Sequence, residues 1–387
     1  MTLLILDLIT KFTSIHIAKT AEEKNAIARF GFDIYVKELG YTPPGIDFKN
    51  QRLWDRLDEC PSTIHIYIGS VQKIQAVLRL LVWEKGNIDN NLFELYSMNL
   101  FPKIENNNVV EIGRVMISPS IRGKYILAAL VRFACKLVLK KGLADLIFSE
   151  CRPGLLPRYT KLGLRLYKAP LNKTPEGFMV PLVAIPSDYQ YHKNNKSLIY
   201  DLIPKYFGPK KRTPLDISLY NHLFEDSNQR IFYDKQMFFS KIANEFHSQH
   251  KKIQLFDNIT DEEIQIIIQK GILLDISRQT ETLTKGRKES EIFIILEGSF
   301  NVIVDEKIVS TLKQGDIFGE MAFFLESGRR TATIKSATTG KILMLDRKCF
   351  QRIQEKHSEL ALKILFNLGR ILSHKLDTLS QCRSLEL

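Results

Sequence analysis

The segment from Asp316 to Ile334 brings together residue types that can hold a small phosphorylated sugar. Arg330 carries a planar guanidinium, which can bind two oxygens of a phosphodiester while backbone N–H groups donate to the same charge. Glu320 can accept a hydrogen bond from a sugar hydroxyl, and Gly319 lets the backbone pass close to a ligand. One phosphodiester charge and one free ribose hydroxyl are what a cyclic nucleotide presents. The predicted nucleotide contacts are Gly319, Glu320, Met321, Ala322, Arg330, Thr331 and Ala332.

This segment resembles the phosphate-binding cassette of the cyclic-nucleotide-binding domains in protein kinase regulatory subunits, gated channels and bacterial catabolite activators. Three glycines stand where that family places its turns: Gly286, Gly298 and Gly315. The resemblance implies cAMP as the allosteric ligand. The alternative is cGMP, because Thr331 places a hydroxyl after the arginine, a position associated with cGMP tolerance in the family. A structural interpretation is also open, in which the acidic and the basic member of the cassette only pair with each other.

A second set of charged residues lies in the first half of the chain. It consists of two aspartates three positions apart, an isolated arginine, and a glutamate and an arginine three positions apart: Asp55, Asp58, Arg79, Glu111 and Arg114. Together with the run from Ala28 to Tyr41, this succession resembles the acyl-homoserine-lactone synthases and long-chain N-acyl amino acid synthases. These are a branch of the GNAT N-acyltransferases that takes acyl chains from acyl carrier protein. The resemblance implies one catalytic cluster around an acceptor amine; the structural alternative is turn caps and a plain ion pair.

The spacing of Glu111 and Arg114 sets a condition on the backbone. Residues 109–118 are predicted to form a strand, and residues three apart on a regular strand point to opposite faces of a sheet. The two side chains could then not share a site. A β-bulge adds one residue to a strand and restores them to one face, and Gly113 between them suits a bulge. We therefore predict a bulge at this point.

The loop from Pro119 to Tyr125 leads into a predicted helix, and the free amides of a helix N-terminus favour phosphate. With the helix end at Leu156–Gly163, this loop resembles the acyl-donor site of the GNAT enzymes. The resemblance implies Tyr159 as the acid for the leaving thiolate. It assigns the donor contacts to Arg122, Gly123 and Lys124. The loop departs from the family at Ser120 and Tyr125, where glutamine and glycine are usual, so tight binding of the coenzyme A pyrophosphate is not expected.

The chemistry that this set supports is aminolysis of a thioester. Glu111, directly or through a water, would take a proton from the acceptor amine as the amine attacks the carbonyl. A backbone N–H near the bulge would stabilise the oxyanion. The expected donor is an acyl carrier protein thioester or acyl-CoA, and the expected acceptor is a small amine or an amino acid. Two alternatives stay open: a GNAT protein lysine acetyltransferase, and a non-enzymatic sensor or adaptor.

The elements that must position these residues form two different folds. In the first half the predicted order is helix 21–39, strands 63–68, 75–83 and 109–118, helix 125–141 and strand 144–149. This order predicts an α/β sandwich with a mixed sheet, which is GNAT-like as the resemblance implies. From Leu273 onward, short strands between glycine turns (291–296, 300–304, 307–312 and 331–336) predict a β jelly roll with flanking helices. The fold class is α+β.

We expect an acyltransferase domain over residues 1–190, a helical linker over 191–250 and a nucleotide-binding domain over 251–387. Residues 348–379 are predicted to form one long amphipathic helix. Its apolar stripe must pack on a second copy, on the first domain or over the bound base, so a homodimer through this helix is one expectation. Because neither a DNA-binding domain after the jelly roll nor a kinase motif is found, the nucleotide is expected to act on the first domain.

The net charge and the placement of the cysteines indicate which kind of partner and which cellular compartment to expect. The net charge is +12, and from Lys251 onward there are 21 Lys and Arg against 19 Asp and Glu, so nearly all of the excess lies in the first 250 residues. A basic domain suits an acidic partner such as acyl carrier protein. The five cysteines are scattered, which indicates neither a metal site nor a disulfide framework. With no signal peptide and no apolar run of ~20 residues, we expect a cytoplasmic protein without a transmembrane segment.

Overall fold

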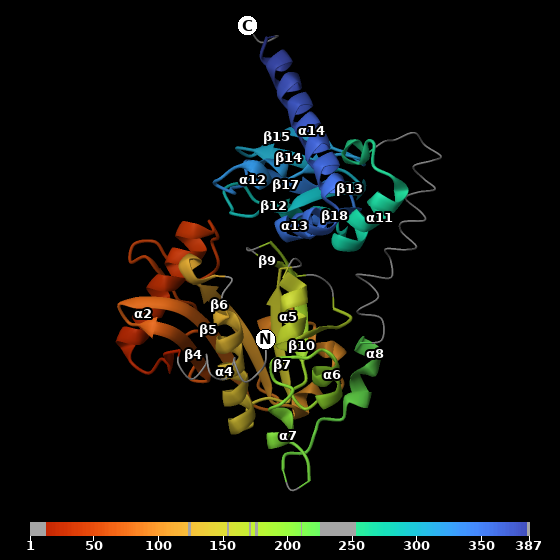
Figure 1. The fold of residues 1–387 in the computed structure, drawn as a ribbon. Coiled ribbons are helices and arrows are strands. Elements are labelled where there is room, and N and C mark those ends of the chain that lie inside the picture. The colour runs from red at the N-terminus through yellow and green to blue at the C-terminus, as the bar shows by residue number, and fades with distance from the viewer. Residues whose placement is uncertain are drawn as a thin grey trace. The chain divides into compact units, whose positions relative to one another are not determined.

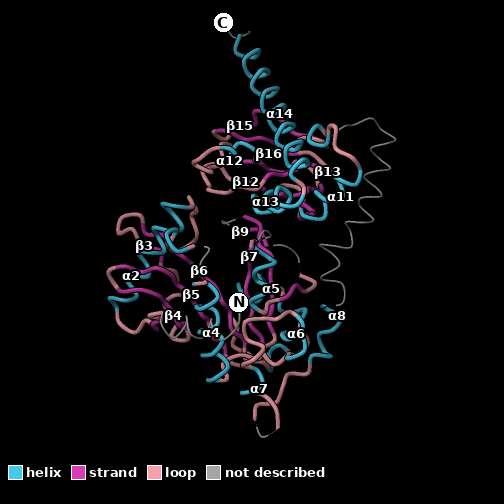
Figure 2. Tube along the Cα trace, viewed as in Figure 1, coloured by secondary structure: helices cyan, strands magenta, loops and turns pink. Residues whose placement is uncertain are grey.

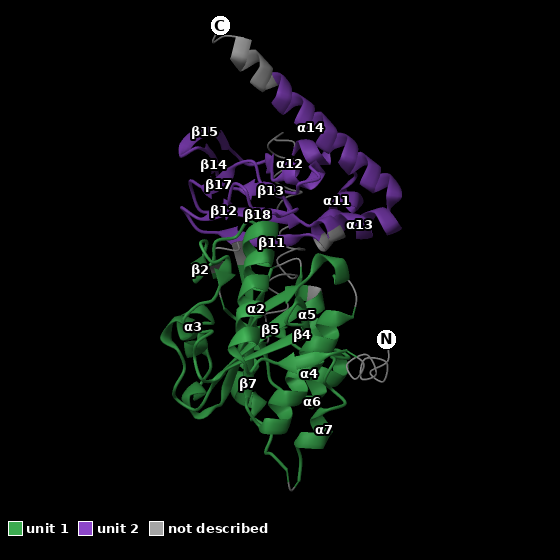
Figure 3. Ribbon diagram, turned by 90° about the vertical axis from the view of Figure 1, so that its left-hand side faces the viewer, with its two compact units in different colours: residues 1–228 green, residues 229–387 purple. Residues whose placement is uncertain are grey.

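The computed structural model describes residues 13–122, 125–152, 155–169, 172–174, 177–209, 211–224 and 253–384. The chain divides into two compact units, residues 1–228 and residues 229–387 (Figure 3). The first unit is built on one large mixed sheet, and the second on two smaller antiparallel sheets (Figures 1 and 2). The predicted α+β class is therefore confirmed.

The core of the first unit is a sheet with the strand order β1-β4-β5-β6-β7-β10-β8, in which β9 pairs with β10. Every neighbouring pair is antiparallel except β6 and β7, which run parallel. The strands are β1 (Ile15–Ile17), β4 (Thr63–Ser70), β5 (Lys73–Trp83), β6 (Val109–Ile117), β7 (Leu146–Cys151), β8 (Arg165–Leu166), β9 (Asn172–Thr174) and β10 (Gly177–Ala184). A separate hairpin pairs β2 (Ile46–Asp47) with β3 (Arg52–Leu53).

Helices of the first unit follow the predicted order. The first helix among the described residues, α2 (Ala21–Phe32), begins at a capping box formed by Thr20 and Glu23 and continues as a π-helix, η1 (Asp33–Glu38). A long apolar helix, α4 (Ile126–Lys141), ends at Gly142 in the left-handed conformation with φ 65°. The remaining helical pieces are α3 (Asn90–Leu95), η2 (Met98–Leu100), η3 (Ile104–Asn106), η4 (Pro119–Ile121), α5 (Leu156–Leu162), α6 (Tyr189–Asn194), α7 (Ile203–Tyr206), η6 (Ile217–Tyr220) and α8 (Asn221–Phe224).

The segment that follows β10 packs on the first unit as far as the structure describes it. Tyr220 and Leu223 are buried in the same apolar cluster as Phe148 of β7. Arg132 of α4 is fully buried and donates to the carboxylate of Asp201 at 2.8 and 2.9 Å. The start of the predicted linker thus carries core residues of the first unit. Residues 225–250 of that linker lie outside the described residues.

The strand register collects the charged residues of the central strands on one face of the sheet. His65 of β4 is the partner of Arg79 on β5, and Arg79 is in turn the partner of Gly113 on β6. Glu111 stands two residues before Gly113, and residues two apart on a strand point the same way. These side chains therefore share the face that α2 covers with Ile27.

A β-bulge interrupts β6 next to this face. Val77 pairs with Met116 and Arg79 pairs with Gly113, so β6 has two residues where β5 has one between these pairs. The predicted bulge is therefore present. Its left-handed residue is Arg114, with φ 49°, although glycine is the residue that adopts this conformation without strain. Such a conformation costs about 1–3 kcal/mol and is often found at functional sites.

The parallel strands β6 and β7 pair over only part of their length. Their ladder runs from Val109 and Leu146 to Glu111 and Phe148 and then stops, although both strands continue (Figure 1). Just beyond this point the Ser149 hydroxyl donates to the carbonyl of residue 112 at 2.7 Å. Backbone pairing between two central strands of the sheet thus ends at Glu111, and one side-chain hydrogen bond bridges them just beyond it.

The second unit consists of two four-stranded sheets, with orders β11-β18-β13-β16 and β12-β17-β14-β15. The strands are β11 (Ile272–Ile276), β12 (Glu281–Leu283), β13 (Ile292–Glu297), β14 (Phe300–Val304), β15 (Lys307–Leu312), β16 (Ile317–Phe318), β17 (Thr333–Ser336) and β18 (Gly340–Leu345). The accompanying helices are η7 (Gln254–Phe256), α11 (Asp261–Lys270), α12 (Glu320–Phe324), α13 (Arg347–Lys356) and α14 (Ser358–Ser384). All strand pairs are antiparallel, as a jelly roll requires.

The prediction of one long helix over residues 348–379 is wrong. Two helices, α13 and α14, meet at His357, whose φ of −143° and ψ of 64° are not helical. The apolar pattern hid this break because residues on both sides of it, Ile353 and Leu360, are buried in the same cluster. Among the described residues, no helix is both long enough and apolar enough to cross a membrane.

Candidate active site and nucleotide site

The turn after β3 presents two aspartates through reciprocal hydrogen bonds. Asp58 accepts from the backbone N–H of Asp55 at 2.9 Å, and Asp55 accepts from the N–H groups of Leu57 and Asp58 at 2.8 and 3.0 Å. This local pattern is an Asx turn, which is why aspartates suit it. The two side chains do cap a turn, but their remaining oxygens face the central strands.

Those oxygens meet the arginines of β5 and β6. One Nη of Arg79 donates to Asp58 at 3.0 Å and to Asp55 at 3.3 Å, and Arg114 donates to Asp55 at 2.6 Å. The other Nη of Arg79 lies 3.9 Å from Oε2 of Glu111. All five predicted residues thus come together in one group, Asp55, Asp58, Arg79, Glu111 and Arg114, which we call the charged cluster.

Burial and charge act against each other in the charged cluster. Burial disfavours the ionised form of Asp58, but the hydrogen bond from His65 and the charge of Arg79 outweigh it, so its pKa lies well below the usual range. Burial likewise opposes the charge of Arg79, yet its carboxylate neighbours raise its pKa above the usual value. Both groups therefore stay charged at neutral pH.

Glu111 is the member whose charge is least compensated. Its side chain is 7% exposed, and the hydroxyl of Tyr96 donates to Oε1 at 3.3 Å. Its other oxygen, Oε2, is buried without a hydrogen-bond partner in the described part of the chain. Burial raises the pKa of Glu111 even though Arg79 and the Tyr96 hydroxyl oppose the shift. A buried carboxylate with a raised pKa and a free acceptor oxygen has the properties of a general base.

Gly113 leaves the space that the carboxylate of Glu111 occupies. A Cβ at position 113 would lie 2.2 Å from Oε1 and 2.9 Å from Oε2 of Glu111. A larger residue here would therefore displace the end of the Glu111 side chain, while the backbone conformation of residue 113 does not itself demand glycine. The position of the Glu111 carboxylate thus depends on the absence of a side chain at residue 113.

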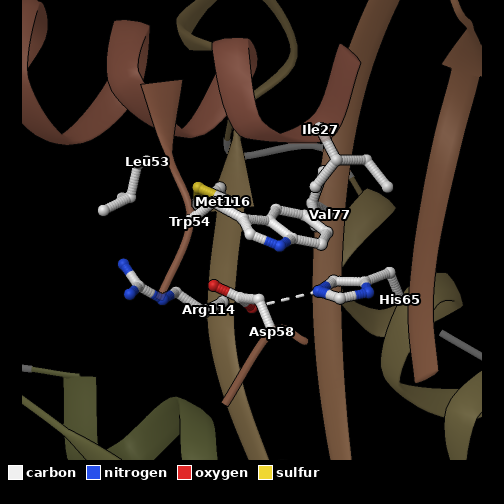
Figure 4. A pocket seen from close by; sticks show the side chains of 8 residues that line it. All are labelled: Ile27, Leu53, Trp54, Asp58, His65, Val77, Arg114 and Met116. Atoms are coloured by element: carbon white, nitrogen blue, oxygen red, sulfur yellow. Dashed lines mark hydrogen bonds and ion pairs between the residues drawn. The ribbon is translucent and has the colours of Figure 1, made fainter. Parts of the chain in front are cut away.

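A small pocket opens beside the charged cluster (Figure 4). Its lining combines apolar, aromatic and charged side chains, namely Ile27, Leu53, Trp54, Asp58, His65, Val77, Arg114 and Met116. His65 is bonded through Nε2 to Asp58 at 3.0 Å and stacks on Trp54 with ring centroids 4.7 Å apart. The lining offers both charged and apolar contacts, and the space between these side chains is about the size of one water molecule in this conformation.

The sequence did not single out Trp54, His65 or Tyr96 as site residues. The first two carried a weak signal, because Trp54 precedes Asp55 and His65 faces inward on an alternating strand. Tyr96 gave none, since its contact with Glu111 exists only in the folded chain.

The structure describes only some of the residues predicted to bind the acyl donor or to protonate its thiolate. Tyr159 lies on α5, and burial of its hydroxyl raises its pKa, with smaller contributions in the same direction from Cys151 and Tyr35. Both Nη groups of Arg122 are bonded to Glu38, and its Nε donates to the carbonyl of residue 117 at 2.8 Å. The other two predicted donor contacts, Gly123 and Lys124, lie outside the described residues.

In the second unit Arg330 is buried and its guanidinium is fully engaged. Its Nε donates to Glu289 at 3.2 Å and one Nη to the carboxylate of Glu291 at 3.0 Å. The other Nη donates to the carbonyls of Glu291 and Gly319 at 2.8 and 2.9 Å. A Cβ at position 319 would lie 2.8 Å from this Nη, and φ there is 85°, so only glycine fits. The arginine predicted to bind phosphate is thus held by two carboxylates of the same unit.

Glu320 does not pair with Arg330, so the purely structural interpretation of the cassette does not describe this arrangement. Its buried carboxylate instead accepts from Lys375 of α14 at 2.9 Å. The hydroxyl of Thr331 is exposed and contacts only the sulfur of Met321, at 3.7 Å, among the contacts described. The side chain of Ala322 is buried at the start of α12, next to Met321.

Comparison with known families agrees with both arrangements. Residues 26–186 match the family described as N-acyl amino acid synthase FeeM, and residues 276–357 match the cyclic nucleotide-binding domain family. The chain joins an N-acyl amino acid synthase domain to a cyclic nucleotide-binding domain. Both resemblances noted in the sequence are thereby confirmed. Among the described residues of the two domains, no group of His, Cys, Asp and Glu could hold a metal ion.

Individual relatives cover only parts of the chain. Mouse cGMP-dependent protein kinase 2 is 28% identical over 108 residues, which are 28% of this chain and 14% of the kinase. The cGMP-dependent protein kinase of Plasmodium berghei (strain Anka) is 41% identical over 69 residues, 18% of this chain and 8% of the kinase. The chain therefore spans a small fraction of these relatives. The solved structure of FeeM, an N-acyl amino acid synthase from uncultured soil microbes, aligns with a TM-score of 0.39 at 13% identity, covering 49% of this chain and 97% of that one.

Proposed function

We propose that the N-acyl amino acid synthase domain transfers an acyl chain from a thioester to the amine of a small molecule or amino acid, under control of a cyclic nucleotide. One observation carries the catalytic part of this proposal. Glu111 is buried with a free acceptor oxygen at the place where β6 and β7 stop pairing. An acyl thioester laid between the open strands would bring its carbonyl close to this base.

The proposed reaction is a direct aminolysis. The neutral amine attacks the thioester carbonyl, a C–N bond forms, and the proton that the nitrogen loses passes to Glu111 directly or through a water. A backbone N–H beside the bulge stabilises the oxyanion. Collapse of this intermediate breaks the C–S bond, and Tyr159, which lies on the β7 side of the opening, protonates the thiolate. Glu111 then releases its proton to the solvent, and the Tyr159 phenolate takes up a proton from the solvent, so both groups return to their starting states.

The proposed acceptor site is the pocket beside the charged cluster, whose lining side chains must move apart to admit a molecule larger than water. Asp55 and Asp58 can hold an ammonium group before it loses its proton, and Arg114 can bind a carboxylate if the acceptor is an amino acid. The apolar wall of Ile27 and Val77 suits an aliphatic or aromatic part of the same molecule. This lining supports a zwitterionic acceptor more than the flexible lysine of a protein.

Acyl carrier protein is the donor that the first domain suits better than coenzyme A. Arg122, which was predicted to contact the donor, is paired with Glu38, and this ion pair would have to break before Arg122 could bind a pyrophosphate. The donor loop also lacks the usual glutamine and glycine at Ser120 and Tyr125. A basic domain attracts an acidic carrier protein over long range, with a strong dependence on salt.

The proposed ligand of the second domain is cAMP or cGMP. The cyclic phosphate would replace the carboxylates of Glu289 and Glu291 on Arg330, and the ribose 2′-hydroxyl would donate to Glu320. Thr331 offers an exposed hydroxyl near the base, and the matched relatives named above are cGMP-dependent kinases, so both nucleotides have to be tested.

We also propose that α14 joins two copies of the chain. One side of this helix is buried in its own unit, while Leu362, Phe366 and Leu376 are 66%, 70% and 63% exposed on the other. Their spacing of four and ten residues places them along one stripe. Light scattering of the wild type and of a Phe366→Ser variant tests this: a dimer that the substitution weakens supports it, and a wild-type monomer contradicts it.

The test of function uses the full-length protein. It is incubated separately with acyl carrier protein and coenzyme A thioesters of several chain lengths, together with a mixture of amino acids and simple amines, and N-acyl products are sought by mass spectrometry. Glu111→Gln keeps the shape of the side chain but removes the base, so turnover should fall by ~10²–10⁴. Glu105→Gln, an exposed change in the same domain, is the matched control.

Each other outcome points to a different function. Acetylation of added proteins from acetyl-CoA, without small-molecule products, would identify a lysine acetyltransferase. An intact protein that binds nucleotide and forms no product with any donor would be a sensor or adaptor.

A further inference from the structure

A cation lies on the carboxylate that the ribose is expected to use. Lys375 donates through Nζ to Oε1 of Glu320 at 2.9 Å and to the carbonyl of Ile317 at 3.0 Å. Glu320 is 4% exposed, so this ammonium is the partner that offsets its buried charge. The contact joins residues 55 positions apart in sequence and brings α14 to the nucleotide site.

The position of Lys375 is fixed by the helix that carries it. Leu368 and Ile371, on the turns before it, are buried in the core of the second unit. Residues four apart lie on the same side of a helix, so Lys375 continues the buried side of α14 beyond Ile371. The ammonium is therefore delivered by a docked helix, and it can leave Glu320 only if its own side chain or the end of the helix moves.

We infer that Lys375 competes with the ribose 2′-hydroxyl for Glu320, so that a bound nucleotide detaches this part of α14 from the site. A hydroxyl donates a weaker hydrogen bond than an ammonium, and Glu320 gives the ribose its full acceptor strength only when Lys375 has left. The inference rests on the proposed nucleotide site. According to this inference, Lys375 couples the position of α14 to the ribose 2′-hydroxyl, separately from any effect of the base and the phosphate.

Affinity for one nucleotide cannot test this by itself, because removing a positive charge also weakens attraction to the phosphate. The ratio of two affinities removes that effect. Cyclic nucleotides and their 2′-deoxy analogues carry the same phosphate and base, so the ratio of their dissociation constants reports only the contact made by the 2′-hydroxyl.

The experiment measures this ratio by calorimetry for full-length wild type, Lys375→Met and Lys363→Met, with cAMP and cGMP and their 2′-deoxy forms. Lys363 is the matched control, since it lies on the same helix and pairs with Glu263 at 2.8 and 2.9 Å. Its side chain is 37% exposed, against 38% for Lys375. In Lys375→Met the preference for the 2′-hydroxyl should rise by ~3-fold or more, because Glu320 no longer shares its charge. In Lys363→Met it should stay as in the wild type.

A second measurement follows the release directly. Brief labelling of lysine amines with an acylating reagent, read by peptide mass spectrometry, should show Lys375 becoming several-fold more reactive with the ribonucleotide than with the 2′-deoxy analogue. Lys363 should react equally with both. An unchanged or lower ratio in Lys375→Met, or a Lys375 that labels equally in both complexes, overturns the inference and leaves the nucleotide site standing. A wild type that binds neither nucleotide overturns both.

Discussion

Replacing Gly113 by alanine tests the position of the base without touching its chemistry. The added Cβ would lie 2.2 Å from Oε1 of Glu111, whereas ordinary contacts begin at 3.4 Å. The carboxylate must therefore retreat by about 1 Å, since the backbone of β6 is held by its pairing with Arg79 on β5. The retreat also stretches the hydrogen bond from Tyr96, which is 3.3 Å long already.

A displacement of this size has a predictable kinetic cost. Misplacing a catalytic group by 1 Å can lower a rate by ~10², so kcat for acyl transfer should fall about 100-fold. Because Asp55 and Arg114 keep their places, the KM for the acceptor should change little. The loss should approach that of Glu111→Gln, and the double variant should be no worse than Glu111→Gln alone, since both changes disable the same group.

The assay is steady-state transfer with the best donor and acceptor, accompanied by thermal unfolding. Gly31→Ala is the matched control, because it adds the same methyl group in the same domain at an ordinary 3.4 Å from Leu53. It lies in α2, where alanine is favoured over glycine. If Gly113→Ala unfolds at the wild-type temperature and keeps kcat within threefold, Glu111 is not the base. A loss of transfer in Gly31→Ala would show that the domain is merely sensitive to packing.

Three further predictions concern the pKa of Glu111, the affinity for the nucleotide and the effect of the nucleotide on acyl transfer. Tyr96→Phe removes a hydrogen bond that lowers the pKa of Glu111, so this pKa should rise. Because the base must be ionised, the acidic limb of the profile of kcat/KM against pH should move to higher pH. An acidic limb that does not move would show that Tyr96 does not influence the base. Arg330→Ala removes charge-assisted bonds to the phosphate that contribute ~1.5–3 kcal/mol each, so calorimetry should show at least tenfold weaker nucleotide binding. Saturating cAMP or cGMP should change transfer several-fold, activation being the expected direction, in the wild type but not in Arg330→Ala; equal rates with and without nucleotide would refute the coupling.

Local patterns were enough to predict most of the fold. The strands 63–68, 75–83 and 109–118 and the helix 125–141 were predicted because their apolar residues repeat with a clear period, and burial maintains that period in the folded chain. The break at His357 was missed for the same reason, because the apolar period continues across it. The packing of Tyr220 and Leu223 was missed because polar and proline-rich surroundings look like a linker when only neighbours in sequence are considered.

The members of the charged cluster could be named from the sequence, but their pairing could not. The order of the motifs along the chain predicted the five residues. The bulge was predicted because side chains alternate between the two faces of a strand, so that Glu111 and Arg114 could share a face only if one residue were inserted. The partners of Arg330 and Glu320 were not predicted, because Glu289 and Lys375 belong to other strands and helices. An ion pair between elements that are distant in sequence produces no periodic pattern in that sequence, so it can be identified only in the folded chain.

The ion pairs of the second domain set a limit on what a nucleotide can do there. At the proposed site, binding would exchange Glu289 and Glu291 for a phosphate on Arg330, and Lys375 for a hydroxyl on Glu320, so contacts would be replaced rather than simply gained. The free energy available to move α14 is the difference between the new and the old contacts. A ligand shifts a conformational equilibrium only by its difference in affinity for the two states. On this proposal the pre-formed ion pairs lower the affinity for the nucleotide and, because they must break when it binds, couple its binding to the position of the helix.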